Sequence, residues 1–238
     1  MSGGSLPFDA WAAEWIAYAA VPSVSLAQKC LKMSQVLERP DLDISSQMAT
    51  IRELAMLGGR RPMYGGLDAN MSGDAAGTGG ALRHILLDSV MERGYGYPLA
   101  VAVICREALG YAGYAAAITA SPERPHLEVN SRALDMVGNR PVEPGRPPLP
   151  EPYILAHLLH ILRRAYMRLP DHQRVLRCIA MARGMGADHP CHDRDIGIIL
   201  HRRGDERAAW WLKRYLRANP DAHDIEQVED LIASMERR

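Results

Sequence analysis

The sequence Gly94-Tyr95-Gly96-Tyr97-Pro98 interrupts a helical pattern that runs from Leu82 to Leu109. Two glycines and a proline within five residues are typical of a break between helices. Proline is tolerated at the first position of a helix, because the N–H group that it lacks would have no partner there. We therefore predict that a new helix starts at Pro98.

Short segments with the period of β-strands follow this helix: 114–120, 126–129 and 133–137. If Asn130-Ser131 forms a two-residue hairpin turn, Val129 pairs with Arg132, and His126 lies opposite Asp135 on the same face of the sheet. Directly opposed residues have Cβ atoms about 5 Å apart. The sequence therefore predicts an imidazole–carboxylate contact between His126 and Asp135.

A helix N-terminus is also where proteins place nucleophilic cysteines, since its free N–H groups and its dipole stabilise a thiolate. A helix start, a strand with a histidine and a strand with an aspartate follow one another here in the order of a Cys-His-Asp acyl-transfer site. In this arrangement Asp135 would fix the tautomer of His126, and His126 would act as a general base.

Several short motifs share this order with a known family: Arg93 with Gly96-Tyr97-Pro98, Pro125-His126-Leu127, Leu134-Asp135-Met136, Gly204-Asp205 and the segment 215–221. Together they resemble the transglutaminase-like superfamily, and most closely its bacterial branch named after the invasion-regulator protein SirB. The match is incomplete, because two residues separate Arg93 from Gly96 and the histidine strand lacks the family's glycine and phenylalanine. The resemblance extends over most of the chain.

The resemblance implies an α+β fold: a helical N-terminal region with a small antiparallel sheet, as in papain-like cores, followed by an all-α helical-repeat tail. Six prolines occur between Pro141 and Pro152, which favours an extended connector. We therefore expect a transglutaminase-like domain at 1–143, a proline-rich connector at 144–152 that few contacts cross, and a tetratricopeptide-like helical domain at 153–238.

Active members of the superfamily have a cysteine where this chain has Pro98, whereas proline is usual in the branch that the chain resembles. Cys105 lies seven residues farther along, about 10 Å up the helix, which is too far to replace the missing nucleophile. The four cysteines, which form no C-x-x-C motif, are expected to be reduced thiols: Cys30, Cys105, Cys178 and Cys191.

Two functions follow from these features. The chain is either a non-catalytic protein that binds a protein or peptide partner, or an enzyme that does without cysteine. In the second case His126 and Asp135 would activate a nucleophile for acyl transfer, amide-bond formation or hydrolysis of a carrier-bound acyl substrate. Tyr95, Tyr97 and Pro98 are the expected substrate-binding residues, and the sequence leaves open whether the protein is an enzyme.

Composition narrows the classes of partner. The 28 basic and 28 acidic residues of the 238 cancel, and aromatic residues make up only 6%, which argues against nucleic-acid binding. The apolar segment 11–26 contains Glu14 and Pro22, so we expect neither a membrane span nor a signal peptide, and therefore a cytoplasmic protein. The resemblance implies that it is bacterial.

No motif calls for a cofactor. Gly77-Thr78-Gly79-Gly80 lacks the Lys-Ser/Thr of a P-loop. The segment 189–193, His-Pro-Cys-His-Asp, contains possible metal ligands, but three of them fall where a helix needs an N-cap and a polar first turn, so we assign no metal site. The arginines 163, 164, 168, 174 and 177 predict a solvated basic helix face, with an acidic partner as the alternative.

Overall fold

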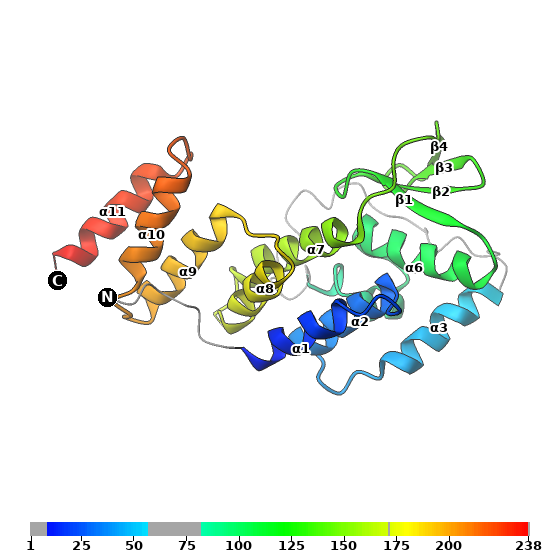
Figure 1. Cartoon of the computed structure of the whole chain (residues 1–238), viewed down its shortest axis with the longest axis horizontal. Helices are drawn as coiled ribbons and strands as arrows, with labels where there is room; N and C mark the ends of the chain where they lie inside the picture. Colours follow the sequence, from blue (N-terminus) through cyan, green and yellow to red (C-terminus); the bar gives the residue numbers. More distant parts are fainter. Residues whose placement is uncertain (1–8, 57–81, 171, 238) are drawn as a thin grey trace.

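A computed structural model of the chain describes residues 9–56, 82–170 and 172–237. It confirms the α+β class, with N-terminal helices, a small antiparallel sheet and further helices after it (Figure 1). The front helices are α1 (Ala10–Ala19), α2 (Leu26–Leu37), α3 (Ile44–Met56), α5 (Leu87–Arg93) and α6 (Pro98–Tyr111). The segment Gly77-Thr78-Gly79-Gly80 lies outside the described residues.

The break before α6 forms as predicted. Gly94 ends α5 in the left-handed region with φ 74°, which glycine adopts without steric cost, and Pro98 is the first residue of α6. Gly96 passes so close to the side chain of Val90 and the carbonyl oxygen of His84 that a Cβ atom would lie 2.4 Å and 2.8 Å from them. This turn therefore has room only for glycine.

The sheet has the order β1-β2-β3-β4, with every neighbouring pair antiparallel. Its strands are β1 (Ala116–Ala120), β2 (Pro125–Val129), β3 (Arg132–Asp135) and β4 (Arg140–Val142). Asn130 and Ser131 both have positive φ, 47° and 61°, as a two-residue type I′ turn requires. The predicted register is confirmed, because Val129 pairs with Arg132 and His126 with Asp135.

The strand β4 was not predicted, because the proline density after residue 140 argued against a strand. Pro141 is tolerated there because β4 is an edge strand, whose outward side needs no N–H donor.

The C-terminal helices are α7 (Glu151–Tyr166), α8 (Gln173–Gly184), α9 (Pro190–Arg202), α10 (Ala208–Ala218) and α11 (Ile225–Glu236). Consecutive helices pack together, α7 with α8, α9 with α10, and α10 with α11, as in a helical-repeat array.

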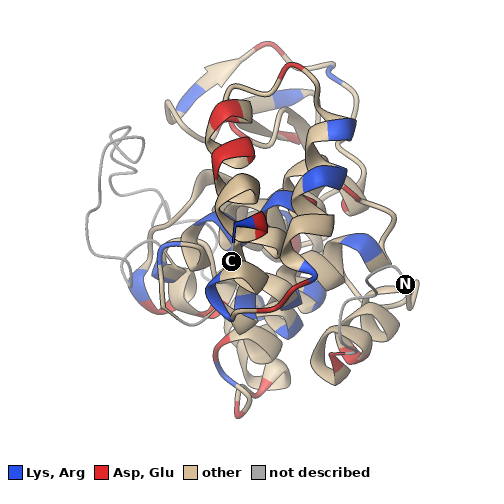
Figure 2. Cartoon of the chain, turned by 90° about the vertical axis from the view of Figure 1, so that its left-hand side faces the viewer, with Lys and Arg blue, Asp and Glu red and all other residues tan. Residues whose placement is uncertain are grey.

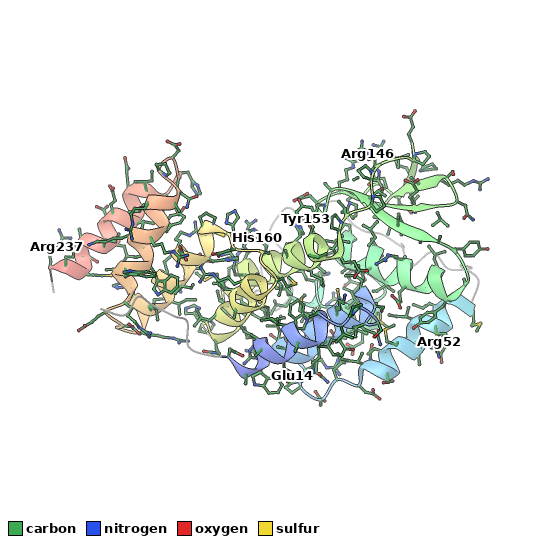
Figure 3. All side chains as sticks on the ribbon, viewed as in Figure 1. Glu14, Arg52, Arg146, Tyr153, His160 and Arg237 are labelled. Carbon is green, nitrogen blue, oxygen red and sulfur yellow. The ribbon has the colours of Figure 1, made fainter. Side chains whose placement is uncertain are left out.

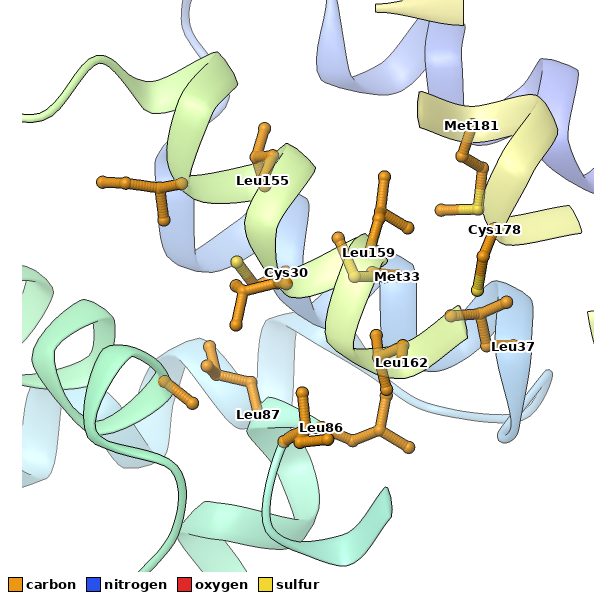
Figure 4. Close-up of a cluster of buried hydrophobic side chains, with 14 of the residues drawn as sticks. Cys30, Met33, Leu37, Leu86, Leu87, Leu155, Leu159, Leu162, Cys178 and Met181 are labelled. Carbon is orange, nitrogen blue, oxygen red and sulfur yellow. The ribbon is translucent and has the colours of Figure 1, made fainter. Parts of the chain in front are cut away.

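The expectation that few contacts cross the proline-rich connector is wrong. One hydrophobic core includes buried side chains from both sides of it. In Figure 4, Cys30, Met33 and Leu37 of α2 and Leu87 of α5 lie beside Leu155, Leu159 and Leu162 of α7 and Met181 of α8. In addition, α1 packs directly against α8. Whether the segments 1–143 and 153–238 can fold separately stays a prediction.

The predicted basic helix face is also wrong for three of its five arginines, which are bound within the fold. Arg174 donates to the carbonyl oxygen of Leu37 (2.7 Å), and Arg177 donates to that of Val36 (2.6 Å). Arg163 is buried in an ion pair with Asp195. Carbonyl groups at the end of α2 thus find donors on α8. Figure 2 shows basic and acidic residues interspersed at the C-terminal end of the molecule.

Residues 143–149, which we call the strap, cross the sheet from one edge to the other. They leave β4 at one edge, and Pro148 then bridges to Thr119 of β1 at the opposite edge. On the way, the N–H group of Gly145 donates to the side chain of Glu128 (3.0 Å), and at the end that of Leu149 donates to the carbonyl oxygen of Ile118 (2.8 Å). The proline-rich segment is therefore extended, as predicted, but it runs over the sheet rather than between two bodies.

Candidate functional site

The predicted site residues fall into two groups on different sides of the sheet. Tyr95, Tyr97 and Pro98 lie at the start of α6, which packs against β1 and β2. Neighbouring residues of a strand point to opposite faces. Ile118 and Leu127, which pair with each other, are part of the hydrophobic core on the α6 side. His126 therefore lies on the outer face of the sheet, away from α6.

The outer face carries a polar row of directly paired residues: Thr119 of β1, His126 of β2 and Asp135 of β3. Their exposed fractions are 1%, 7% and 0%. The strap lies over this row, since Gly145 contacts Glu128 on the same face and the charge of Arg146 acts on His126. Figure 3 labels Arg146 beside the sheet.

The carboxylate of Asp135 binds Arg124 and backbone amides. Arg124 donates to Oδ2 through Nε (3.1 Å) and through a terminal nitrogen (2.7 Å), and the N–H group of Val137 donates to Oδ1 (3.0 Å). Arg140 lies 3.8 Å from the same Oδ2. Burial would raise the pKa of Asp135, but the bonds from Arg124, Val137 and Gly138 outweigh it and lower that pKa below its ordinary value.

The predicted contact between His126 and Asp135 is not a hydrogen bond in the described structure. Nδ1 of His126 is buried without a hydrogen-bond partner there, and the hydroxyl oxygen of Thr119 is in the same situation. Burial lowers the pKa of His126; nearby Arg146 and Arg124 add to the decrease and Asp135 opposes it. The register thus places the two residues opposite each other, while their catalytic role stays a prediction.

Another polar chain lies at the start of α6, where a nucleophile would be expected. The hydroxyl group of Tyr97 lies 3.0 Å from Nε2 of His157 on α7, and Nδ1 of His157 lies 3.6 Å from a carboxylate oxygen of Glu123. Tyr97 also lies 3.4 Å from the carbonyl oxygen of Pro122. These contacts fasten the β1–β2 turn to α6 and α7.

The surroundings of Tyr97 and His157 favour the neutral forms of the phenol and of the imidazole. Burial raises the pKa of Tyr97 to about 12, with a smaller contribution from Glu123. Burial lowers the pKa of His157, which Glu123 only partly offsets. A proton transfer from the phenol to the imidazole would create two charges that this environment disfavours. The pKa directions of Tyr97 and His157 therefore favour a structural role for this bond over an activated nucleophile.

Arg124, Glu123 and His157 were not predicted from the sequence. Nothing local connects His157 to a tyrosine 60 residues earlier. Arg124 precedes the histidine strand directly, but only the fold shows that its guanidinium group reaches Asp135 on β3.

The cysteines lie inside the protein. All four are buried, including Cys105 in the middle of α6. Burial raises the pKa of Cys30 and of Cys178 far above the ordinary thiol value. For Cys178 the nearby Arg163 and Arg177 only partly offset this effect. Thiols in such surroundings are poor nucleophiles at neutral pH.

His189 caps a helix, as its position in the sequence predicted. Its Nδ1 atom accepts from the N–H group of Cys191 (3.2 Å) at the start of α9, and Nδ1 of His192 accepts from the N–H group of His189 (3.3 Å). Within the described ranges, no group of three or more His, Cys, Asp or Glu side chains could hold a metal ion. In the same ranges, no helix has the length and apolar character to cross a membrane.

Replacing Asp135 with asparagine is expected to lower the free energy of unfolding by about 1–2 kcal/mol at pH 7, because the charge-assisted bonds to Arg124 are lost. The pKa of Asp135 is lower in the folded than in the unfolded chain, so its contribution is complete above about pH 4 and is lost as pH falls through the folded pKa. Urea unfolding at pH 7 and at pH 3 measures both effects. A difference between variant and wild type that is the same at both pH values would contradict this account.

Comparison with known proteins gives no relative. No family model, no curated protein and no solved structure matches the chain.

Proposed function

We propose that the chain is a transglutaminase-like protein without a nucleophilic cysteine, and that it binds a protein or peptide partner. The observation that carries this proposal is the start of α6. Pro98 stands at its first position, and the polar chain next to it, Tyr97 with His157 and Glu123, has both inner groups biased to their neutral forms. A covalent acyl-transfer step finds no thiolate among these residues.

The alternative function is an enzyme in which His126 and Asp135 act in base catalysis. The arrangement of the sheet gives this alternative less support. A general base needs a partner that orients its imidazole, but the carboxylate of Asp135 is occupied by Arg124 and the imidazole of His126 lies under the strap. His126 is also on the face of the sheet away from the start of α6. Base catalysis by this pair would require a rearrangement of both residues.

Exposed aromatic side chains near the start of α6 support a binding role. Tyr95 is 36% exposed, and Tyr153 of α7 is 52% exposed. Tyr153 lies one helical turn from His157, which contacts Tyr97. Tyrosine is enriched in protein interfaces, where it buries a large area at a low cost in side-chain entropy. We call Tyr95, Tyr97 and Tyr153 the tyrosine surface.

Site-specific photo-crosslinking tests this proposal. A benzophenone amino acid at position 153 is expected to crosslink the full-length chain to a discrete protein partner in cells. The matched control is position 114, since Tyr114 has a similar exposure (48%) but lies beyond the other end of α6. Crosslinks of equal yield at both positions would show non-specific contact and contradict a binding site at the tyrosine surface.

The activity of the purified chain provides a second arm. With an acyl thioester and a primary amine, we expect turnover no faster than in buffer for the wild type and for His126→Ala. A general base normally contributes a factor of about 100 to 10,000 to a rate. Turnover by the wild type that falls by such a factor in His126→Ala would overturn the non-catalytic proposal in favour of base catalysis.

A further inference from the structure

The strap is attached to the sheet by few interactions. Residues 143–148 are exposed, and Pro144, Pro147 and Pro148 have no N–H group to donate. Its described backbone attachments are the bridge between Pro148 and Thr119, the bond from Gly145 to the Glu128 side chain and the bond from Leu149 to the carbonyl oxygen of Ile118. A segment with so few buried contacts can open locally without unfolding the core.

His126 lies beneath the strap, and covering it provides no hydrogen bond from the described residues for its Nδ1 atom. Its Nδ1 atom is buried without a partner, directly across from the unpartnered hydroxyl oxygen of Thr119. A buried polar atom without a hydrogen bond destabilises the closed arrangement, because water would satisfy it in the open one.

The charges around His126 do not favour an imidazolium ion. Arg124 from the β1–β2 turn and Arg146 from the strap act on it as cations, and Asp135 from β3 acts as an anion. Asp135 is already bound by Arg124. The remaining charged groups of this face are engaged or exposed: Glu128 accepts from Gly145, Arg140 of β4 lies near Asp135, and Glu143 is exposed.

We propose that the strap is an acid-released cover, in which protonation of His126 detaches residues 143–149 from the outer face of the sheet. In the closed form the imidazole is neutral and feels the positive charges of Arg124 and Arg146. The open form exposes the imidazole to water, where it can take up a proton. Opening also uncovers the row Thr119–His126–Asp135 and the outer edge of β1, so it would control access to that face. This inference does not rest on the proposed partner binding.

Proton linkage gives the size of the expected rise in the open population of the strap as pH falls. Burial and the neighbouring arginines lower the pKa of His126 in the closed form, whereas an exposed histidine has a pKa of about 6.5. The open form therefore binds more protons, and it is favoured as pH falls below about 6.5. At pH 5.5 an exposed histidine is about tenfold more protonated than neutral, so the open population rises up to about tenfold over that at pH 7.5.

Amide hydrogen exchange of the full chain, followed by NMR at pH 7.5 and pH 5.5, tests the proposal. The informative amide is that of Leu149, whose bond to Ile118 closes the strap. After correction for intrinsic exchange rates, its protection should fall up to about tenfold at pH 5.5. The amide of Ile104, in the buried middle of α6, should keep its protection and so report on global stability.

Variants identify the proton-binding group. In His126→Gln the pH dependence of Leu149 protection should disappear, while in His157→Gln, which changes another histidine whose pKa burial lowers, it should remain. In Arg146→Gln the drop should become smaller than in the wild type, because one of the cations that oppose protonation in the closed form is gone. This last variant alters an exposed residue and tests the proposal even if His126→Gln fails to fold.

The contrary results are equally definite. Protection of Leu149 that is the same at both pH values in the wild type, or a drop that persists in His126→Gln, would overturn the acid-released cover. So would a drop in Arg146→Gln as large as in the wild type. None of these results bears on photo-crosslinking at position 153, so the two proposals can fail separately.

Discussion

Replacing Trp15 with alanine is expected to lower the free energy of unfolding by about 3–5 kcal/mol, the usual range for the loss of a buried tryptophan. Trp15 has no exposed surface and lies on α1, which packs against both α2 and α8. Its indole N–H group donates to the carbonyl oxygen of Lys29 (3.0 Å). The variant therefore loses packing on both sides of the proline-rich segment together with this hydrogen bond.

Trp11 provides the matched control for this experiment. It lies on the same helix but is 41% exposed, with the guanidinium group of Arg177 over its ring at 5.6 Å. Trp11→Ala should cost less than about 1 kcal/mol, the range of an exposed cation–π contact. Urea unfolding of both variants measures the difference.

The same Trp15 variant tests the domain boundary that the sequence predicted. If the shared core makes one cooperative unit, hydrogen exchange should show equal losses of protection for amides in α6 and in α8. If α6, which shares the segment 1–143 with Trp15, loses protection and α8 keeps it, the segments 1–143 and 153–238 unfold separately, and the predicted boundary at 144–152 is correct.

Local signals were enough to predict several of the elements. Pro98 at the first position of α6 and the turn at Asn130-Ser131 act over a few residues, and the structure has both of them. The register of β2 and β3 followed from the length of one turn, since a two-residue hairpin leaves no choice of pairing.

Contacts distant in sequence could not be predicted in this way. The proline-rich segment was correctly predicted to be extended, but its course over the sheet depends on where β1 and β4 lie at the two edges. In the sequence, Arg174 and Arg177 look like surface residues of a helix. In the structure, their acceptors are carbonyl oxygens of α2, more than 130 residues earlier. Asp135 likewise has a partner, Arg124, that no spacing rule connects to it.

Replacing Asp195 with alanine should also lower the free energy of unfolding by about 3–5 kcal/mol, because it leaves a charge buried without its partner. Arg163 of α7 is only 3% exposed and forms an ion pair with Asp195 of α9, which is 1% exposed. Burial already lowers the pKa of Arg163, and its Nε atom has no hydrogen-bond partner among the described residues. Urea unfolding measures the loss.

Arg163→Met and Asp195→Ala should lower the free energy of unfolding by different amounts, because the charged residue that remains has different other contacts in each variant. In Arg163→Met the carboxylate of Asp195 keeps two bonds from Arg194, both 3.2 Å long, so the cost should be smaller than in Asp195→Ala. In the double variant Arg163→Met with Asp195→Leu no charge of the pair remains, and apolar side chains of similar volume often replace a buried ion pair without loss. We expect its stability to return to within about 1 kcal/mol of the wild type. A double variant as unstable as Asp195→Ala would mean that the pair contributes stability of its own, and that the junction between α7 and α9 depends on this attraction and not on apolar packing.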